Sequence, residues 1–263
     1  MSGSAHLGAR ASARLDGARL ADLVRGVELL CLDAGNTIIF FDHARLARLT
    51  ARGGFVATAE AFERAEGQAK LAQECGEGVR VAWSCAGHPG ADSWAEMIGT
   101  MLVRAGMPLE QVPPALDALW VDHRAFNLWS RVPAGLVDSL VALRSAGVKV
   151  AVVSNSEGKL REFFETLDLM RGLDFVVDSG IVGVEKPDPR IFGVALARSG
   201  VSAARGLHLG DNFVTDVGGA RAAGLRVALI DPFDHLAGRH GDVPRVSGVS
   251  EVADSIVRMR AGS

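Results

Sequence analysis

The order of strand-like and helix-like segments is the feature of this sequence that most restricts its fold. A short apolar run, VELLCLDAG from Val27, is typical of a strand buried on both faces of a parallel sheet. Residues 43–130 are instead rich in Ala, Leu, Glu and Arg and show no strand-like alternation. We therefore expect one domain whose first strand is separated from the rest of its sheet by an inserted helical unit.

The insert is divided by breaks that contain glycine and proline. RGG, CGEG, AGHPGAD and GMPLEQVPP stop the helical pattern, so we predict four helices, at about 43–52, 57–75, 91–105 and 110–129. The insert also contains all the tryptophans, and we expect them to form its core rather than a substrate platform. They are Trp83, Trp94, Trp120 and Trp129.

Strand-like and helix-like segments alternate at short spacing after residue 131. The apolar runs VKVAVVS, LDFVVD, GLHLG and LRVALI lie between helix-like segments, several of which end at a glycine. This alternation predicts an α/β fold, a doubly wound parallel sheet with an inserted α-helical cap. The predicted domains are a core of 27–42 and 131–263, a cap of 43–130, and an N-terminal extension of 1–26. The sequence does not decide whether the extension is a packed helix or a loose segment.

Polar side chains follow the predicted strands at their carboxyl ends. Asp33 follows the first strand, Ser154 and Asn155 the second, Lys186 lies in the loop GVEKPDP, and LHLGDNFVTD contributes Asp211 and Asp216. In open α/β sheets ligands bind at this edge. Carboxylates bind Mg²⁺, and a lysine beside them would neutralise an incoming phosphate. We expect a polar crevice there, covered by the insert.

These segments resemble, in this order, the four motifs of the haloacid dehalogenase (HAD) superfamily of hydrolases. The motifs are LDAGNT, AVVSNS, VEKPDP and GDNFVTD, and the resemblance covers about residues 27–232. The insert resembles the small helical cap of the phosphatase-like branch. The resemblance implies a Mg²⁺-dependent phosphatase that acts on a small phosphorylated metabolite through an aspartyl-phosphate intermediate.

The resemblance also implies roles for single residues. Asp33 would be the nucleophile, and Ser154 and Lys186 would be catalytic through their bonds to the transferring group. Ser154, Asn155 and Lys186 would bind the substrate. The implied Mg²⁺ ligands are Asp33, the backbone carbonyl of Gly35, Asp211 and Asp216.

The residues taken singly also fit structural roles. Asp33 could cap a turn, and Ser154 and Asn155 could cap a helix that starts near Glu157. Asp216 falls early in a helical pattern, where an acid favours the helix dipole. The residues alone leave both interpretations open.

Gly35 departs from the pattern of the family. Most phosphatases of this superfamily have a second aspartate at this position, two residues after the nucleophile, which protonates the leaving group and later activates water. General acid–base catalysis contributes about 10²–10⁴-fold, so its absence should affect either the rate or the choice of substrate. Candidates for the missing group in and near the insert are His43, His88, His123 and Glu66.

Gly35 therefore leaves three alternatives open. Hydrolysis of a carbon–phosphorus bond, as in phosphonoacetaldehyde hydrolases, would use a cap lysine as a Schiff base, and Lys70 is the only cap lysine. Lys70 also fits a surface ion pair with Glu66 and Glu74 on one helix. A 2-haloacid dehalogenase would share the pair Ser154 and Asn155. A protein that binds a phosphorylated ligand without turnover is the third alternative.

Composition restricts the partners. The formal net charge is −3, with 28 basic and 31 acidic residues, so no general basic surface favours nucleic acid. No run reaches the 18 or more apolar residues typical of a membrane span. The three cysteines form no metal-binding pattern, and their odd number favours reduced thiols and a cytoplasmic location. We expect a monomer or a homodimer.

Overall fold

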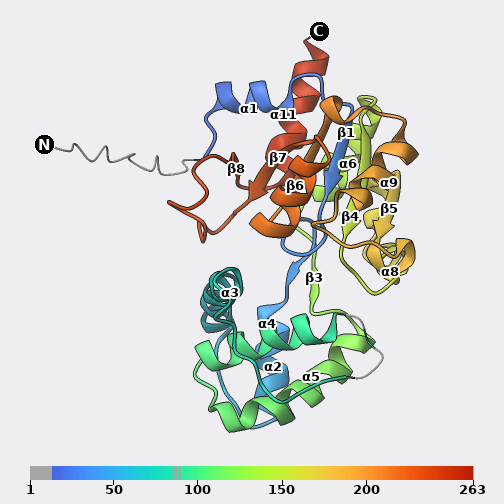
Figure 1. Ribbon diagram of the computed structural model, residues 1–263. Coiled ribbons are helices and arrows are strands. Elements are labelled where there is room, and N and C mark those ends of the chain that lie inside the picture. Colours follow the sequence, from blue (N-terminus) through green and yellow to red (C-terminus); the bar gives the residue numbers. More distant parts are fainter. Residues whose placement is uncertain (1–13, 86–87, 89, 263) are drawn as a thin grey trace, which may run out of the picture.

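A six-stranded parallel sheet forms the centre of the larger part of the molecule in the computed structural model, which describes residues 14–85, 88 and 90–262 (Figure 1). The strand order is β5-β4-β1-β6-β7-β8, so the first strand of the chain lies inside the sheet. This arrangement confirms the predicted fold class. The strands are β1 (Leu29–Leu32), β4 (Lys149–Ser154), β5 (Phe175–Asp178), β6 (Gly206–Gly210), β7 (Arg226–Ile230) and β8 (Arg245–Val246).

Helices cover both faces of this sheet. One face carries α1 (Gly17–Val24), α6 (Leu136–Ser145), α7 (Leu160–Thr166) and α11 (Val249–Ala261). The other carries α9 (Pro189–Ser199), α10 (Gly219–Ala222) and a π-helix at Phe213–Gly218. The remaining short helices are α8 (Ser179–Val182) and the 3-10 turns Leu109–Gln111, Leu169–Gly172 and Ala203–Arg205.

The two faces explain why the first strand is apolar throughout. Leu30 and Leu32 pack into the core under α6 and α11, while Leu29 and Cys31 pack into the core under α9. All four side chains are fully buried, as expected for a central parallel strand. Within the described residues, no helix combines the length and apolar character that crossing a membrane requires.

The N-terminal extension contains a helix. The Asp16 side chain caps α1 by accepting a hydrogen bond from the Arg19 backbone N–H at 2.9 Å. Leu20 and Val24 are buried, and α1 packs against α11. Residues 1–13 of the predicted extension lie outside the described residues.

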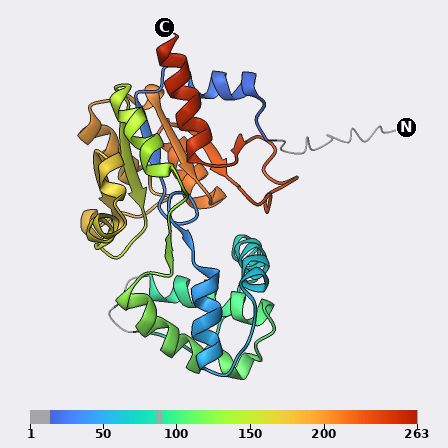
Figure 2. The same cartoon turned by 180° about the vertical axis from the view of Figure 1, so that it is seen from behind.

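Four helices form a separate bundle, which we call the helical unit (Figure 2). It has its own apolar core, in which Phe62, Ile98 and Met101 are fully buried. Trp94 and Trp120 belong to this core, as the sequence predicted, and Trp83 packs against it. The helices are α2 (His43–Arg52), α3 (Ala59–Glu74), α4 (Ala91–Arg104) and α5 (Val112–Ala125).

The prediction that the last of these helices reaches residue 129 is wrong. The helix ends at Ala125, because Phe126 is extended and the Asn127 side chain accepts a hydrogen bond from the Trp129 backbone N–H at 2.9 Å. Trp129 begins β3 (Trp129–Arg131), which pairs in antiparallel fashion with β2 (Phe40–Phe41). This two-stranded ribbon joins the helical unit to the sheet domain.

Candidate active site

The carboxyl end of the sheet faces the helical unit across a cleft of about 1020 Å³. All the residues that the sequence predicted for the site line this one cleft. They are Asp33, Gly35, Ser154, Asn155, Lys186, Asp211 and Asp216.

Lys186 lies at the centre of the site, where its ammonium group joins two carboxylates. Its Nζ donates to Oδ1 of Asp33 at 2.5 Å and to Oδ1 of Asp216 at 2.7 Å. Ser154 Oγ donates to the same oxygen of Asp33 at 3.1 Å. All four side chains are buried, so these bonds act in a weakly screened environment.

Burial and charge displace the pKa values of these groups in different directions. Burial raises the pKa of Asp33 to about 7, although the neighbouring Lys186 acts to lower it. Burial would favour the neutral form of Lys186, but Asp216 and Asp33 outweigh it and hold the lysine pKa above its usual value. Burial likewise opposes the ionisation of Asp216, yet Lys186 and His208 keep its pKa below the usual range. A cation beside Asp33 would favour its ionised form.

Asn155 holds the loop that carries Lys186. Its Oδ1 accepts from the Lys186 backbone N–H at 2.7 Å, and its Nδ2 donates to the Lys186 carbonyl at 3.0 Å. The suggested capping role of Ser154 and Asn155 is wrong, because α7 starts at Leu160 and neither side chain bonds its first turn. The role of Asn155 in substrate binding stays a prediction.

Asp178, rather than Ser154 or Asn155, accepts hydrogen bonds from the backbone at the start of α7. Its Oδ1 accepts from the Gly158 backbone N–H at 3.0 Å and its Oδ2 accepts from the Leu160 backbone N–H at 3.1 Å. The loop between Ser154 and α7 is thus tied to the end of β5.

Two further residues of the site were missed by sequence reasoning. His208 in β6 is fully buried, and its Nε2 lies 2.9 Å from Oδ1 of Asp216. Burial lowers the His208 pKa, so the neutral ring donates this hydrogen bond. A histidine within the apolar strand GLHLG was the available signal. His235, on the loop after β7, lines the cleft and had no comparable signal.

The acidic cluster fits a divalent cation. One carboxylate oxygen from each of Asp33, Asp211 and Asp216 lies within 4.8 Å of the others. The Gly35 carbonyl receives no hydrogen bond from the described residues. Oxygen ligands with free lone pairs are what Mg²⁺ prefers, so these residues are suited to hold it.

Lys70 reaches this cluster from the helical unit. Its Nζ lies 2.8 Å from Oδ2 of Asp211 and 4.0 Å from Glu66. Burial alone would lower the pKa of Lys70, but Asp211 and Glu66 raise it above its usual value. The expected ion pair with Glu74 is wrong, because Glu74 pairs with Arg239 and His240 of the sheet domain at 3.5 and 3.4 Å.

The proposed substitutes for the missing acid occupy different places. His43 and Glu66 are buried against each other at 2.8 Å in the helical unit and do not line the cleft. His88 pairs with Arg124 at 2.6 Å. His123 lines the cleft, but burial lowers its pKa to about 4 and its Nδ1 accepts from the Leu128 backbone N–H. His123 is therefore neutral at physiological pH.

Close packing behind the Lys186 loop leads to a testable prediction. A Cβ at Gly219 would lie 2.8 Å from Phe192 and 3.0 Å from the carbonyl oxygen of Pro187. Gly219→Ala should therefore displace the loop and lower the free energy of unfolding by about 1–3 kcal/mol, measured by urea denaturation. Gly218→Ala is the matched control, since its nearest neighbour is the Phe213 carbonyl oxygen at 4.0 Å. Equal stability of the two variants would contradict this packing argument.

Known proteins resemble the chain in sequence and in fold. The family model for haloacid dehalogenase-like hydrolases matches residues 27–224. Haloacid dehalogenase-like hydrolase domain-containing protein 3 of Bos taurus is 35% identical over 145 residues, which cover 54% of this chain and 57% of that protein. Phosphoserine phosphatase of Thermus thermophilus is 31% identical over 162 residues, which cover 58% and 64% of the two chains. The chain thus spans little more than half the length of these curated relatives.

A solved structure extends the likeness in fold. The HAD-hydrolase YfnB of Bacillus subtilis, crystallised bound to magnesium, gives a TM-score of 0.62 over 88% of this chain and 98% of that chain. The sequence identity is 17%, so this likeness concerns the fold alone.

Proposed function

The chain belongs to the haloacid dehalogenase-like hydrolase family, and from this premise we propose that it is a Mg²⁺-dependent phosphatase of a small phosphorylated metabolite. The observation that carries the proposal is the bridge from Lys186 to Asp33 and Asp216, with Asp211 beside it. A buried cation among three acids suits an incoming phosphate, which brings further negative charge. The relative named as a phosphoserine phosphatase supports the same class of reaction.

In the proposed mechanism each side chain acts through its observed contacts. Oδ2 of Asp33 attacks the phosphorus, because Oδ1 is held by Lys186 and Ser154. Lys186 and Ser154 then stabilise charge on the transferring phosphoryl group. Water hydrolyses the aspartyl phosphate and restores Asp33. Bound Mg²⁺ would be held by Asp33, the Gly35 carbonyl, Asp211 and Asp216, and would neutralise charge on the phosphate.

The helical unit acts in this proposal as a cap that excludes water and binds the organic part of the substrate. It contributes Lys70, Trp94, Met97 and His123 to the lining of the cleft. Lys70 would then contact the bound phosphate or the metal ligands. Its raised pKa disfavours the neutral amine that a Schiff base requires, which argues against hydrolysis of a carbon–phosphorus bond.

A panel of phosphate esters tests the proposal. Sugar phosphates, nucleotides, phosphoserine and an aryl phosphate should include substrates from which phosphate is released with Mg²⁺ and not with EDTA. If none of the esters released phosphate, the proposed phosphatase activity would be rejected. Metal-independent halide release from 2-haloacids would instead establish a dehalogenase, and borohydride trapping at Lys70 would establish the Schiff base. Binding of phosphate esters without turnover would instead indicate a protein that binds a phosphorylated ligand without catalysis.

The contact between Lys70 and Asp211 leads to a prediction about metal affinity. Lys70→Met should tighten Mg²⁺ binding about tenfold in calorimetry, because a positive charge next to Asp211 repels a second cation. Lys149→Met is the control, since Lys149 is half exposed and contacts Asp174 at the other end of β4. Unchanged or weaker binding by Lys70→Met would show that Lys70 does not compete with the metal.

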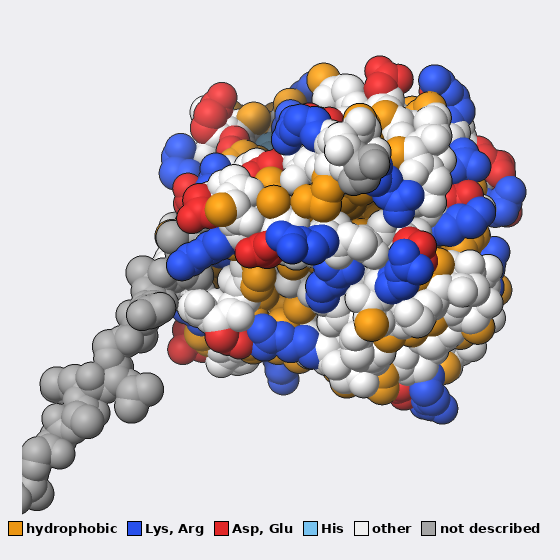
Figure 3. Space-filling model, turned by 90° about the horizontal axis from the view of Figure 1, so that it is seen from above, with side chains coloured by type: hydrophobic (Ala, Val, Ile, Leu, Met, Phe, Trp, Pro, Cys, Tyr) orange, Lys and Arg blue, Asp and Glu red, His pale blue; other side chains and the backbone are white. Residues whose placement is uncertain are grey.

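Three other expectations remain predictions. They concern a cytoplasmic location, a monomer or homodimer, and the lack of a nucleic-acid partner. On the face drawn in Figure 3, basic side chains are interspersed with acidic ones. Figure 3 thus shows one mixed surface rather than a stripe of a single sign on that face.

A further inference from the structure

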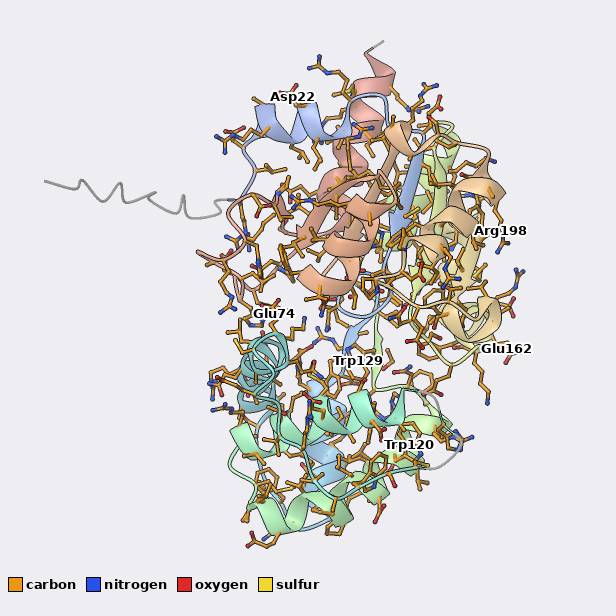
Figure 4. The ribbon with its side chains drawn as sticks, viewed as in Figure 1. Asp22, Glu74, Trp120, Trp129, Glu162 and Arg198 are labelled. Atoms are coloured by element: carbon orange, nitrogen blue, oxygen red, sulfur yellow. The ribbon has the colours of Figure 1, made fainter. Side chains whose placement is uncertain are left out.

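The space next to Gly35 is occupied by Trp129. A Cβ placed on Gly35 would lie 3.7 Å from Cδ1 and 3.8 Å from Nε1 of the Trp129 indole. The edge of the indole that carries the N–H therefore lies where a side chain at position 35 would begin. Figure 4 shows Trp129 between the sheet domain and the helical unit. Both residues line the cleft together with Asp33.

The position of Trp129 is well defined. Its strand pairs with Phe41, and the two rings meet edge to face with centroids 4.8 Å apart. Trp129 packs against the core of the helical unit and against the core under α6. Among the described residues, none accepts a hydrogen bond from its Nε1. A fixed N–H donor is thus available beside the nucleophile loop.

An indole N–H cannot replace a carboxylic acid in full. It donates a hydrogen bond but does not release its proton near neutral pH. A hydrogen bond to a charged group contributes about 10- to 10²-fold, whereas general acid catalysis contributes about 10²–10⁴-fold. His123, which also lines the cleft, has a pKa of about 4, so its ring is neutral at pH 7 and is not a general acid. Burial lowers the pKa of His235, another lining residue, as well. With neither a carboxylic acid at position 35 nor an imidazolium in the cleft, we expect a leaving group to depart largely as an anion.

The walls of the cleft favour a planar organic group. Trp129 and Phe40, both partly exposed, line it with aromatic surface, and Met97 adds a flexible apolar side chain. Aromatic rings pack favourably in stacked or edge-to-face arrangements with a planar partner.

We propose that the substrate is a phosphate ester of an acidic planar hydroxyl, a phenol or an enol, and that Trp129 determines this specificity. The inference rests on the proposed phosphatase activity. Asp33 Oδ2 forms a bond to phosphorus, and the bond from phosphorus to the ester oxygen breaks. The electron pair leaves on that oxygen, which accepts a hydrogen bond from Trp129 Nε1 and takes its proton from water. Water then cleaves the aspartyl phosphate to inorganic phosphate and free Asp33.

Rates across a series of leaving groups test this proposal. The substrates are 4-nitrophenyl phosphate, phenyl phosphate, phosphoenolpyruvate and glycerol phosphate, each with saturating Mg²⁺. We expect kcat/KM for glycerol phosphate to be lower than for 4-nitrophenyl phosphate by about 10³-fold, because its alkoxide departs without an acid. The phenyl and enol esters should fall between them, and their order distinguishes a phenol site from an enol site.

Variants of Trp129 separate the hydrogen bond from the aromatic surface. Trp129→Phe should lower kcat/KM for phenyl phosphate about tenfold and change that for 4-nitrophenyl phosphate little, since its phenolate is already stable. Trp129→Leu should also raise KM for the aryl esters, but not for acetyl phosphate, which has no ring. Trp120→Phe is the matched control, because Trp120 is buried in the helical unit and does not line the cleft.

The outcomes distinguish this inference from the proposed function. If glycerol phosphate is turned over as fast as phenyl phosphate, the inferred specificity is wrong, while the proposed phosphatase activity remains supported. Wild-type kinetics of Trp129→Phe and Trp129→Leu with every ester would overturn the role of Trp129. If neither the esters nor acetyl phosphate, an acyl phosphate, released phosphate, the proposed phosphatase activity itself would be rejected.

Discussion

Asp33→Asn should abolish turnover while the protein still folds and binds phosphate esters. The amide has nearly the shape of the carboxylate, and its oxygen can still accept from Lys186 and Ser154. It is a poor nucleophile, so no covalent aspartyl phosphate can form. Loss of a catalytic nucleophile costs about 10⁴-fold or more in kcat. This is the largest effect on activity that we expect from a single substitution.

Trapping of the intermediate provides the measurement. Acid quenching during turnover should leave phosphate on the wild-type protein and none on Asp33→Asn. Asp188→Asn is the control, because Asp188 caps α9 and ion-pairs with the largely exposed Arg190. Full activity of Asp33→Asn would exclude the covalent mechanism, even if the phosphatase activity itself were confirmed.

Lys186→Met should lose both activity and stability. The substitution leaves Asp33 and Asp216 facing each other in a buried site without the cation that now joins them. Removing one partner of a buried ion pair typically costs about 3–5 kcal/mol. The phosphate would also lose the ammonium group that stabilises its charge, so kcat and substrate affinity should fall together.

The loss of stability should depend on pH. Burial acts to raise the pKa of Asp216, but Lys186 outweighs it and holds the pKa below its ordinary value of 3.8. The ionised Asp216 therefore stabilises the wild-type fold above about pH 3.8. That contribution disappears as the pH falls through the lowered pKa of the folded state. In Lys186→Met the contribution is missing, so the deficit should be largest at neutral pH and should shrink below about pH 4.

Urea denaturation at several pH values measures this deficit. Mg²⁺ should restore part of it, because a bound cation also offsets the two carboxylates. Lys159→Met is the control, since Lys159 is exposed at the rim of the cleft. A Lys186→Met protein as stable as wild type at pH 7 would contradict the assigned role of the bridge.

The sheet could be predicted from the sequence because its strands carry a local signal. Leu29–Leu32 is an apolar run followed by Asp33, and Lys149–Ser154 is a largely apolar run that ends at Ser154. Gly147 and Gly200 mark helix ends. β8 carried no such signal: it has only two residues, and its buried Arg245 is compensated by Asp231, which is 14 residues away in the sequence. A two-residue strand is specified by its neighbours rather than by its own sequence.

The site could be predicted only as far as the strand ends determine it. Asp33, Ser154 and Lys186 meet because parallel strands end at one edge. The contact from Lys70 to Asp211 and the position of Trp129 beside Gly35 depend on how the helical unit docks. No periodicity in the sequence encodes that docking, which explains why Trp129 was expected only as a core residue of the insert.

The two-stranded ribbon of β2 and β3, which joins the helical unit to the sheet domain, makes the helical unit an insertion that can be exchanged. Its chain enters after Phe41 and leaves before Trp129, and the Asp42 backbone N–H donates to the Leu128 carbonyl at 2.8 Å. With the entry and exit points held together, the length of chain between them adds little to the entropy of closing the loop. Evolution or an engineer could therefore exchange the segment for another of different size, and alter selectivity while the carboxylates and Lys186 of the sheet domain stay in place.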